Sequence, residues 1–152
     1  MRIRPATPAD RARALEWCGR LAEFDVPAWR TAGEVIDGDA RAVAAWFDDP
    51  DRPDEAMLIA ELDGRPVGVI YLLAPVDYFS GRPHGHVSVL AVAREAEGRG
   101  VGSALLEAAA AWSRARGCDR LTIMVFAGNR RARAVYEKNG FVPEFVRYAR
   151  TL

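Results

Sequence analysis

The chain has 152 residues, enough for one domain with a single hydrophobic core. Half of its residues are hydrophobic, and Lys plus Arg equals Asp plus Glu at 21 each, which excludes the basic surplus of a dedicated nucleic-acid binder. No apolar run is long enough to span a membrane, and the N-terminus lacks the apolar core of a signal peptide. We therefore expect a cytoplasmic protein with one domain, residues 1–152, and with Cys18 and Cys118 as free thiols.

Hydrophobic periodicity and turn signals predict an α/β order of elements. The strands are expected at residues 3–6, 57–62, 66–73, 84–93, 121–126 and 141–148. The helices are expected at residues 8–21, 24–47, 101–116 and 129–139. Asp63-Gly64 is a hairpin signal between the second and third strands, and the helical stretch 24–47 is expected to be interrupted at its proline and glycines.

The strand 84–93 is nearly all apolar in its second half, so we expect it to be central and covered on both faces. The loop after it, EGRGVGS, places Gly98, Gly100 and Gly102 directly ahead of a helix. A helix N-terminus offers unpaired N–H groups and a partial positive charge, and glycines let the backbone approach a phosphate closely. The pattern predicts a site for a phosphorylated ligand, although a tight strand-to-helix turn alone would also explain it.

The spacing of these glycines narrows the choice of ligand. It is not the G-x-x-x-x-G-K-[ST] of a P-loop. It is also G-x-G-x-G rather than G-x-G-x-x-G, and no βαβ unit precedes it, so a dinucleotide-binding fold is disfavoured. We find neither a metal-ligand cluster nor a Ser-His-Asp or Cys-His arrangement above chance, and we expect no metal.

A second segment, GNRRARAVYEKNGF at residues 128–141, changes the interpretation. Together with the glycine loop it resembles the GNAT superfamily of acyl-CoA-dependent N-acetyltransferases, in which an L-A-V strand precedes [QR]-x-x-G-x-[GA] and a later segment reads N-x-x-A-x-x-x-Y-x-x-x-G-F. The resemblance covers residues 57–148 well. The positions that fit are Leu90, Ala91, Val92, Gly100, Gly102, Asn129, Ala132, Tyr136, Gly140 and Phe141.

The resemblance implies a GNAT fold, with a mixed, mostly antiparallel central sheet flanked by helices and splayed between strands 84–93 and 120–126. It implies acetyl-CoA as cosubstrate, with the pyrophosphate on the N–H groups of the glycine loop and the pantetheine arm along the L-A-V strand. The cofactor-binding residues that it implies are Leu90, Ala91, Val92, Glu97, Gly98, Arg99, Gly100, Val101, Gly102, Ser103, Asn129 and Ala132.

Three residues are candidates for proton transfer. Tyr136 matches the family tyrosine that protonates the departing thiolate, although a core tyrosine on an amphipathic helix would look the same. The segment HGHVSVLAV resembles the H-x-H-V-L-A-V strand of arylalkylamine N-acetyltransferases, with His86 kept and Ser88 in place of the second histidine. His86 is the candidate base, directly or through water with Ser88 as relay, and a histidine bonded in the core is the alternative.

The chain departs from the family pattern at Glu97, where Gln or Arg is usual. A carboxylate near a phosphate is repelled, so we expect the Glu97 side chain to point away or to pair with a nearby arginine while its backbone binds. Such a substitution is also the one feature that favours a non-catalytic acyl-CoA-binding sensor over an enzyme.

The function predicted is acetyl transfer from acetyl-CoA to a primary amine of a small molecule or protein, with the sensor as the alternative. The acceptor pocket is expected between residues 8–47 and 74–83. Its candidate lining residues are Phe24, Trp29, Tyr78 and Phe79, although aromatic side chains there are as often part of the core. The resemblance also leaves a homodimer open, with the last strand, 141–148, as its candidate interface.

Overall fold

The computed structural model describes all residues, 1–152, and contains one mixed sheet with the strand order β1-β2-β3-β4-β5. The strands are β1 (Arg2–Pro5), β2 (Glu55–Leu62), β3 (Arg65–Leu73), β4 (Gly85–Val92) and β5 (Leu121–Ile123). The first four pair antiparallel and β5 pairs parallel with β4. The predicted mixed, mostly antiparallel sheet is therefore confirmed.

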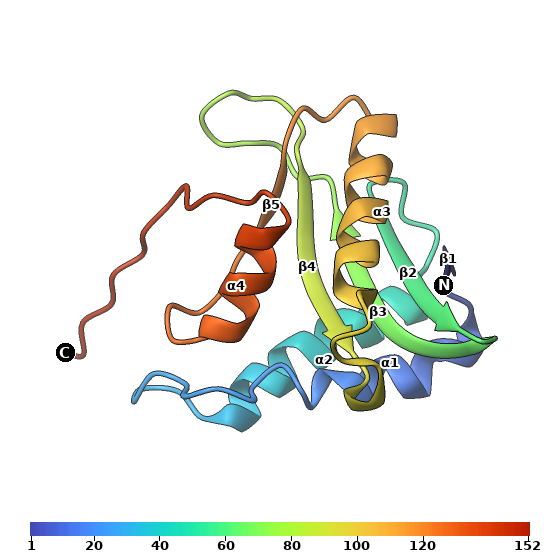
Figure 1. Cartoon of the computed structure of the whole chain (residues 1–152). Helices are drawn as coiled ribbons and strands as arrows, with labels where there is room; N and C mark the ends of the chain where they lie inside the picture. Colours follow the sequence, from blue (N-terminus) through green and yellow to red (C-terminus); the bar gives the residue numbers. More distant parts are fainter.

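Helices cover both faces of this sheet. They are α1 (Arg11–Cys18), α2 (Ala32–Asp48), α3 (Val101–Ala115) and α4 (Arg130–Lys138), with short 3₁₀ turns at Pro8–Asp10 and Arg94–Ala96. Figure 1 shows α3 in front of the sheet, α1 and α2 behind it, and α4 beside β4 on the side of β5. None of the helices has the length and apolar character that a membrane crossing requires.

The core lies on both faces of the middle strands, against α3 on one side and against α1 and α2 on the other. Met57, Ile59, Ile70, Leu72 and Leu105 are among its fully buried side chains. Along β4 the burial alternates, because successive side chains of a strand point to opposite faces. One face of β4 is fully buried and the other, which carries His86 and Ser88, is half-buried, so the expectation of a central strand covered on both faces is only partly met.

The N-terminal half is more regular than predicted. Helix α2 runs without interruption through Gly33 and Gly38, whereas residues 24–31 form no helix. Its start is fixed by a capping box: the Glu34 N–H donates to Thr31 Oγ1 at 3.1 Å, and the Thr31 N–H donates to the Glu34 carboxylate at 2.7 Å. The predicted hairpin is confirmed, with positive φ angles of 51° at Asp63 and 73° at Gly64.

The C-terminal part is less regular than predicted. Strand β5 ends at Ile123 rather than at residue 126, because Phe126 turns away to pack its ring 5.2 Å from that of Phe24. The predicted strand 141–148 is wrong for this structure: beyond Gly140 the chain forms no regular element and leaves the body of the molecule (Figure 1). The contacts that hold this segment to the rest of the protein include an ion pair between Arg120 and Glu144 at 3.5 Å.

Asp10 joins the first strand to the first helical turn. It is 4% exposed, and its carboxylate accepts two bonds from Arg4 (2.7 and 2.9 Å) and one from the Thr7 N–H (2.8 Å). These bonds, of which that from Arg4 is the strongest influence, lower the pKa of Asp10 to about 2.

We predict that Asp10→Asn lowers the free energy of unfolding at pH 7 by about 2 kcal/mol, because Arg4 loses one of its two charged partners and keeps only Glu61. A carboxyl whose pKa is lowered by folding stabilises above its unfolded pKa and loses this contribution as the pH falls through the folded value. The difference between wild type and variant should therefore shrink between about pH 4 and pH 2. Urea unfolding at several pH values measures it, and a difference that does not change with pH would contradict this origin.

Candidate cofactor and catalytic site

Strands β4 and β5 share only three rungs, which pair Gly85 with Leu121, His86 with Thr122 and Val87 with Ile123. Beyond Val87, β4 pairs only with β3, so the two strands splay apart as predicted. The Ala93 N–H donates to the Val67 carbonyl on β3 at 2.8 Å, so the Val92 carbonyl, on the other side of that peptide, faces the open edge. By alternation, Leu90, like Val92, presents its backbone groups to the cleft, whereas Ser88 lies at an irregularity in the β3–β4 register.

The glycine loop lies at the end of β4 that borders this cleft. Gly98 and Gly100 have φ angles of 71° and 78°, which L side chains rarely adopt, and Gly100 is the N-cap of α3. No side chain caps the helix. Within residues 97–104, the backbone N–H groups without a hydrogen-bond partner in the protein are those of Gly98, Gly100, Val101, Gly102 and Ser103.

Five free N–H groups at the positive end of a 15-residue helix suit an anion. A Cβ added at Gly98 or at Gly100 would meet no atom within 4 Å, so the backbone there is open to a ligand. The local chemistry therefore fits the diphosphate of coenzyme A.

Helix α4 lies beside the start of α3: a Cβ on Gly102 would be 4.0 Å from Val135. The Asn129 side chain caps α4 by accepting a bond from the Ala132 N–H at 3.1 Å. The contact of Asn129 and Ala132 with a cofactor stays a prediction.

Tyr136 lies on the half-buried face of α4, with its ring 6.0 Å from that of Phe141. Burial raises the pKa of its phenol to about 12, so the hydroxyl is protonated at neutral pH. This state is the one that a proton donor needs.

His86 lies on the middle rung shared by β4 and β5. Its Nδ1 is 2.9 Å from Thr122 Oγ1, and this hydroxyl donates to the Gly85 carbonyl at 3.3 Å. Because the hydroxyl has one proton, Nδ1 must carry the hydrogen of the imidazole and Nε2 must carry the lone pair. Burial, reinforced by the neighbouring His84, lowers the pKa of His86, which keeps the ring neutral and able to accept a proton.

Ser88 follows His86 on the same face of β4, at the first position beyond the shared rungs. No hydrogen bond joins either residue to Tyr136, which comes from a different element. Thr122 was not predicted as part of the site, because the partner of a strand residue cannot be known before the register of the sheet is known.

Glu97 pairs with arginines, one of the two arrangements expected. Its carboxylate lies 2.6 Å from Arg131 of α4 and also binds Arg20, which follows α1. Arg131 first, and then Arg20, lower the pKa of Glu97 to about 2. Arg20 lies 77 residues from Glu97 in the sequence, and no local pattern indicated it.

Comparison with known proteins supports the same assignment. The sequence profile described as Acetyltransferase (GNAT) family matches residues 19–141. This chain belongs to the GNAT acetyltransferase family. It is therefore an N-acetyltransferase by family, and its activity depends on acetyl-CoA.

Among solved structures, this GNAT chain is similar to a putative acetyltransferase from Agrobacterium tumefaciens, at 21% identity and TM-score 0.75, covering 100% of both chains. It is also similar to an aminoglycoside 6'-N-acetyltransferase from Acinetobacter haemolyticus, at 17% identity and TM-score 0.69, covering 100% of this chain and 99% of the other. A glucosamine-6-phosphate N-acetyltransferase from Arabidopsis thaliana follows, at 18% identity and TM-score 0.65, covering 99% and 97%. No curated protein matches.

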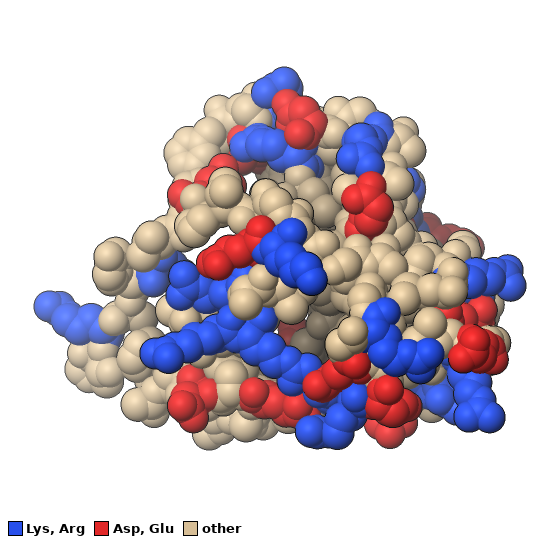
Figure 2. Space-filling model, viewed as in Figure 1, with Lys and Arg blue, Asp and Glu red and all other residues tan.

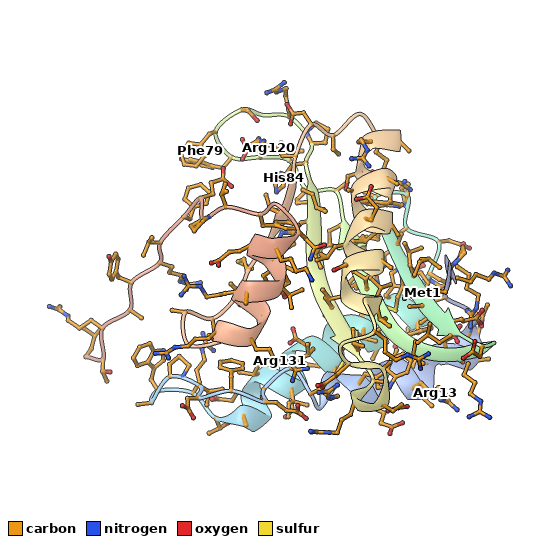
Figure 3. The ribbon with its side chains drawn as sticks, viewed as in Figure 1. Met1, Arg13, Phe79, His84, Arg120 and Arg131 are labelled. Atoms are coloured by element: carbon orange, nitrogen blue, oxygen red, sulfur yellow. The ribbon has the colours of Figure 1, made fainter.

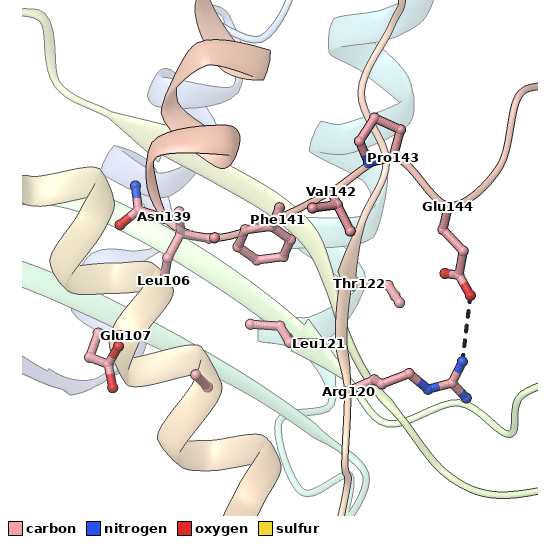
Figure 4. Close-up of a pocket in the computed structure, with 12 residues that line it drawn as sticks. Leu106, Glu107, Arg120, Leu121, Thr122, Asn139, Phe141, Val142, Pro143 and Glu144 are labelled. Atoms are coloured by element: carbon pink, nitrogen blue, oxygen red, sulfur yellow. Dashed lines mark hydrogen bonds and ion pairs between the residues drawn. The ribbon is translucent and has the colours of Figure 1, made fainter.

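The acceptor side of the GNAT domain differs from the expectation. Phe24 and Trp29 lie on the segment before α2, whereas Tyr78 and Phe79 lie in the β3–β4 loop at the other end of β4 (Figures 1 and 3). The structure does not bring these four aromatic residues into one pocket, because the two segments flank opposite ends of the strand. A cavity of about 500 Å³ instead lies between α3, β5 and residues 139–144 (Figure 4).

We predict that Gly100→Ala weakens coenzyme A binding about tenfold, because an L residue at this φ costs about 1–2 kcal/mol and the loop must shift. Gly102→Ala is the matched control, since this residue is helical and the new methyl group would make an ordinary contact with Val135. Isothermal titration with coenzyme A measures both. Equal losses in the two variants would show that the conformation of Gly100 is not what matters.

Proposed function

We propose that this protein transfers the acetyl group of acetyl-CoA to a primary amine of a small molecule or protein. The observation that carries the proposal is the set of free N–H groups at the start of α3, next to the unpaired edge of β4. Backbone donors at a helix N-terminus suit the diphosphate, and an unpaired strand edge suits an extended, amide-bearing arm. Acetyl-CoA supplies the activated acyl group.

The protein's own part is to hold these groups and to move protons. A neutral amine is the nucleophile, and about one alkylamine in a thousand is neutral at pH 7.4. His86 Nε2, directly or through a water next to Ser88, accepts the proton that the amine loses on attack. The Tyr136 hydroxyl donates a proton to the departing thiolate, and backbone N–H groups of the cleft stabilise the charge that develops on the thioester oxygen.

Amino sugars are the first acceptors to test. Two of the similar structures are described as acetyltransferases of aminoglycosides and of glucosamine 6-phosphate. The identities of 17% and 18% make this a starting panel only, to which arylalkylamines and a lysine peptide are added.

We predict that Tyr136→Phe lowers kcat about a hundredfold while the Kd for coenzyme A stays unchanged, because only the proton donor is lost. Tyr148→Phe is the control, since its side chain is 89% exposed and belongs to the C-terminal segment. Thiol release and isothermal titration supply the two numbers. Full activity in Tyr136→Phe would mean that this tyrosine is a packing residue.

We predict that the pH–rate profile has an acid limb below the ordinary histidine range, since a base must be neutral and the pKa of His86 is lowered. His86→Ala should lose this limb and about a hundredfold in rate. His84→Ala should keep it and move it to higher pH, because the repulsion from His84 is removed. A limb that survives in His86→Ala would assign the base elsewhere.

The alternative is a non-catalytic acyl-CoA sensor, which Glu97 favours. A thermal melt with acetyl-CoA, coenzyme A, ATP and NAD separates the outcomes, since a ligand at about a hundred times its Kd adds roughly 2.7 kcal/mol of stability. Stabilisation by the coenzyme A ligands without thiol release across the amine panel would favour the sensor. If neither acetyl-CoA nor coenzyme A stabilises the protein, both functions are contradicted and only the fold assignment stands.

We also infer a cytoplasmic homodimer. The buried, unpaired Cys18 and Cys118 are consistent with a reducing compartment. Of the twelve exposed large hydrophobic residues, ten lie at 76–79, 124–125 and 142–152, so the apolar surface is concentrated. These segments adjoin the open edge of β5, and Phe79 stacks on Phe145 at 5.8 Å. A second copy offers both a matching strand and a matching edge, which favours it as the partner.

We predict by light scattering a mass of about twice 16.7 kDa for the wild type. Val146→Asp should lower it towards the monomer, because a charge enters the apolar surface, whereas Trp29→Asp, at an exposed site outside these segments, should not. A monomer at all concentrations in the wild type would contradict the dimer.

A further inference from the structure

Five charged residues from four segments meet where the cleft between β4 and β5 opens. They are Arg20, Glu23, Arg94, Glu97 and Arg131. Three positive and two negative charges leave the cluster with one net positive charge. Figure 2 shows acidic and basic side chains interspersed along the lower part of this face, and Figure 3 places Arg131 at the foot of α4.

Arg20 reaches across the end of β4. Its guanidinium donates to the Val92 carbonyl, which faces the cleft, and to the carboxylates of Glu97 and Glu23, the latter at 3.0 Å. The side chain is 16% exposed, so this position is well defined by its surroundings. Arg20 therefore occupies the last backbone acceptor on the open edge of β4.

Arg131 approaches the same carboxylate from the other side. It belongs to α4, beyond the cleft, and its side chain is 62% exposed against 16% for Arg20. The Glu97 carboxylate thus joins the two sides of the opening: one oxygen meets Arg20 beside β4 and the other meets Arg131. Directly after Glu97, the free N–H groups of the loop begin at Gly98.

We propose that Arg20, Glu97 and Arg131 form an ion-pair latch across the mouth of the β4–β5 cleft, which an incoming diphosphate opens by taking Arg131 from Glu97. Arg20 keeps Glu97 beside β4, and the more exposed Arg131 changes partner. In the free protein, the Glu97 carboxylate supplies the negative charge with which Arg131 pairs; in the complex, the diphosphate supplies it. This inference rests on the proposed binding of coenzyme A.

The latch makes Glu97 an opponent of binding and a support of the free fold. Glu97→Gln should lower the melting temperature of the free protein, because the link between β4 and α4 is lost. The same variant should bind coenzyme A about tenfold more tightly, because Arg131 is free and a repelling charge is gone. Its affinity should also fall more steeply with salt, since the site gains one net positive charge. A residue that only supports the loop would lower stability and affinity together.

Glu95→Gln is the matched control. Glu95 is exposed, lies two residues away and forms no ion pair, so its replacement changes the net charge equally without touching the latch. Its Kd for coenzyme A should stay within about twofold of the wild type. An equal gain in both variants would trace the effect to general charge and overturn the latch.

The double variant Glu97→Gln/Arg131→Gln tests the exchange of partners. If Arg131 moves from Glu97 to the ligand, Arg131→Gln weakens binding and most of the gain from Glu97→Gln disappears in its presence. Isothermal titration with coenzyme A and with inorganic pyrophosphate gives the four affinities for the cycle. Additive effects, or a Glu97→Gln protein that binds no better than the wild type, would overturn the latch. A wild type that binds no coenzyme A would instead refute the proposed function.

Discussion

The early separation of β5 from β4 is the constraint on which the rest of the site depends. The two strands pair over three rungs, and β4 then continues for five residues with one edge unpaired. The chain after Ile123 is held away by the packing of Phe126 on Phe24 and by the close approach of Gly128 to the Asp25 carbonyl, which a Cβ would meet at 3.1 Å. Unpaired backbone N–H and C=O groups are costly where they are shielded from water. The open edge of β4 therefore suits a ligand that pairs with it.

A second constraint is that the site proposed for an anion contains a negatively charged side chain, Glu97. A pKa of about 2 means that Glu97 is charged at every physiological pH, and it lies directly before the free N–H groups. Two arginines from elements that are distant in sequence compensate this charge. The substitution at the usual Gln or Arg position therefore changes how the site is held before binding, without removing the backbone donors that bind.

Features with a local cause were predictable from the sequence. The turn at Asp63-Gly64, the loop at Gly98 and Gly100, and the Asn129 cap all depend on residues a few positions apart, and the structure contains each of them. The uninterrupted α2 was missed because the packing of a long amphipathic helix outweighed the low helix propensity of Gly33 and Gly38.

Features with a distant cause were not predictable from the sequence. Arg20 and Thr122 act on residues 77 and 36 positions away, and only the folded sheet brings them together. The strand expected at 141–148 has suitable side chains, but a strand requires a partner edge as well as a composition. That segment forms no strand pairing in the single chain, so its sequence preference alone does not make it a strand.

The cleft has two chemically different ends, which orients any ligand that fills it. From Val87 to Val92 the strand advances roughly 17 Å, since each residue of a strand rises by about 3.3 Å. At one end Thr122 fixes the tautomer of His86, and the ring is neutral and half-buried. At the other end lie free N–H groups and a cluster with net positive charge. A ligand with an anionic head and a long neutral arm can satisfy both ends in one direction only. In that direction the charged head lies beside the free N–H groups of α3. The far end of the neutral arm then lies beside His86, whose neutral ring can accept a proton.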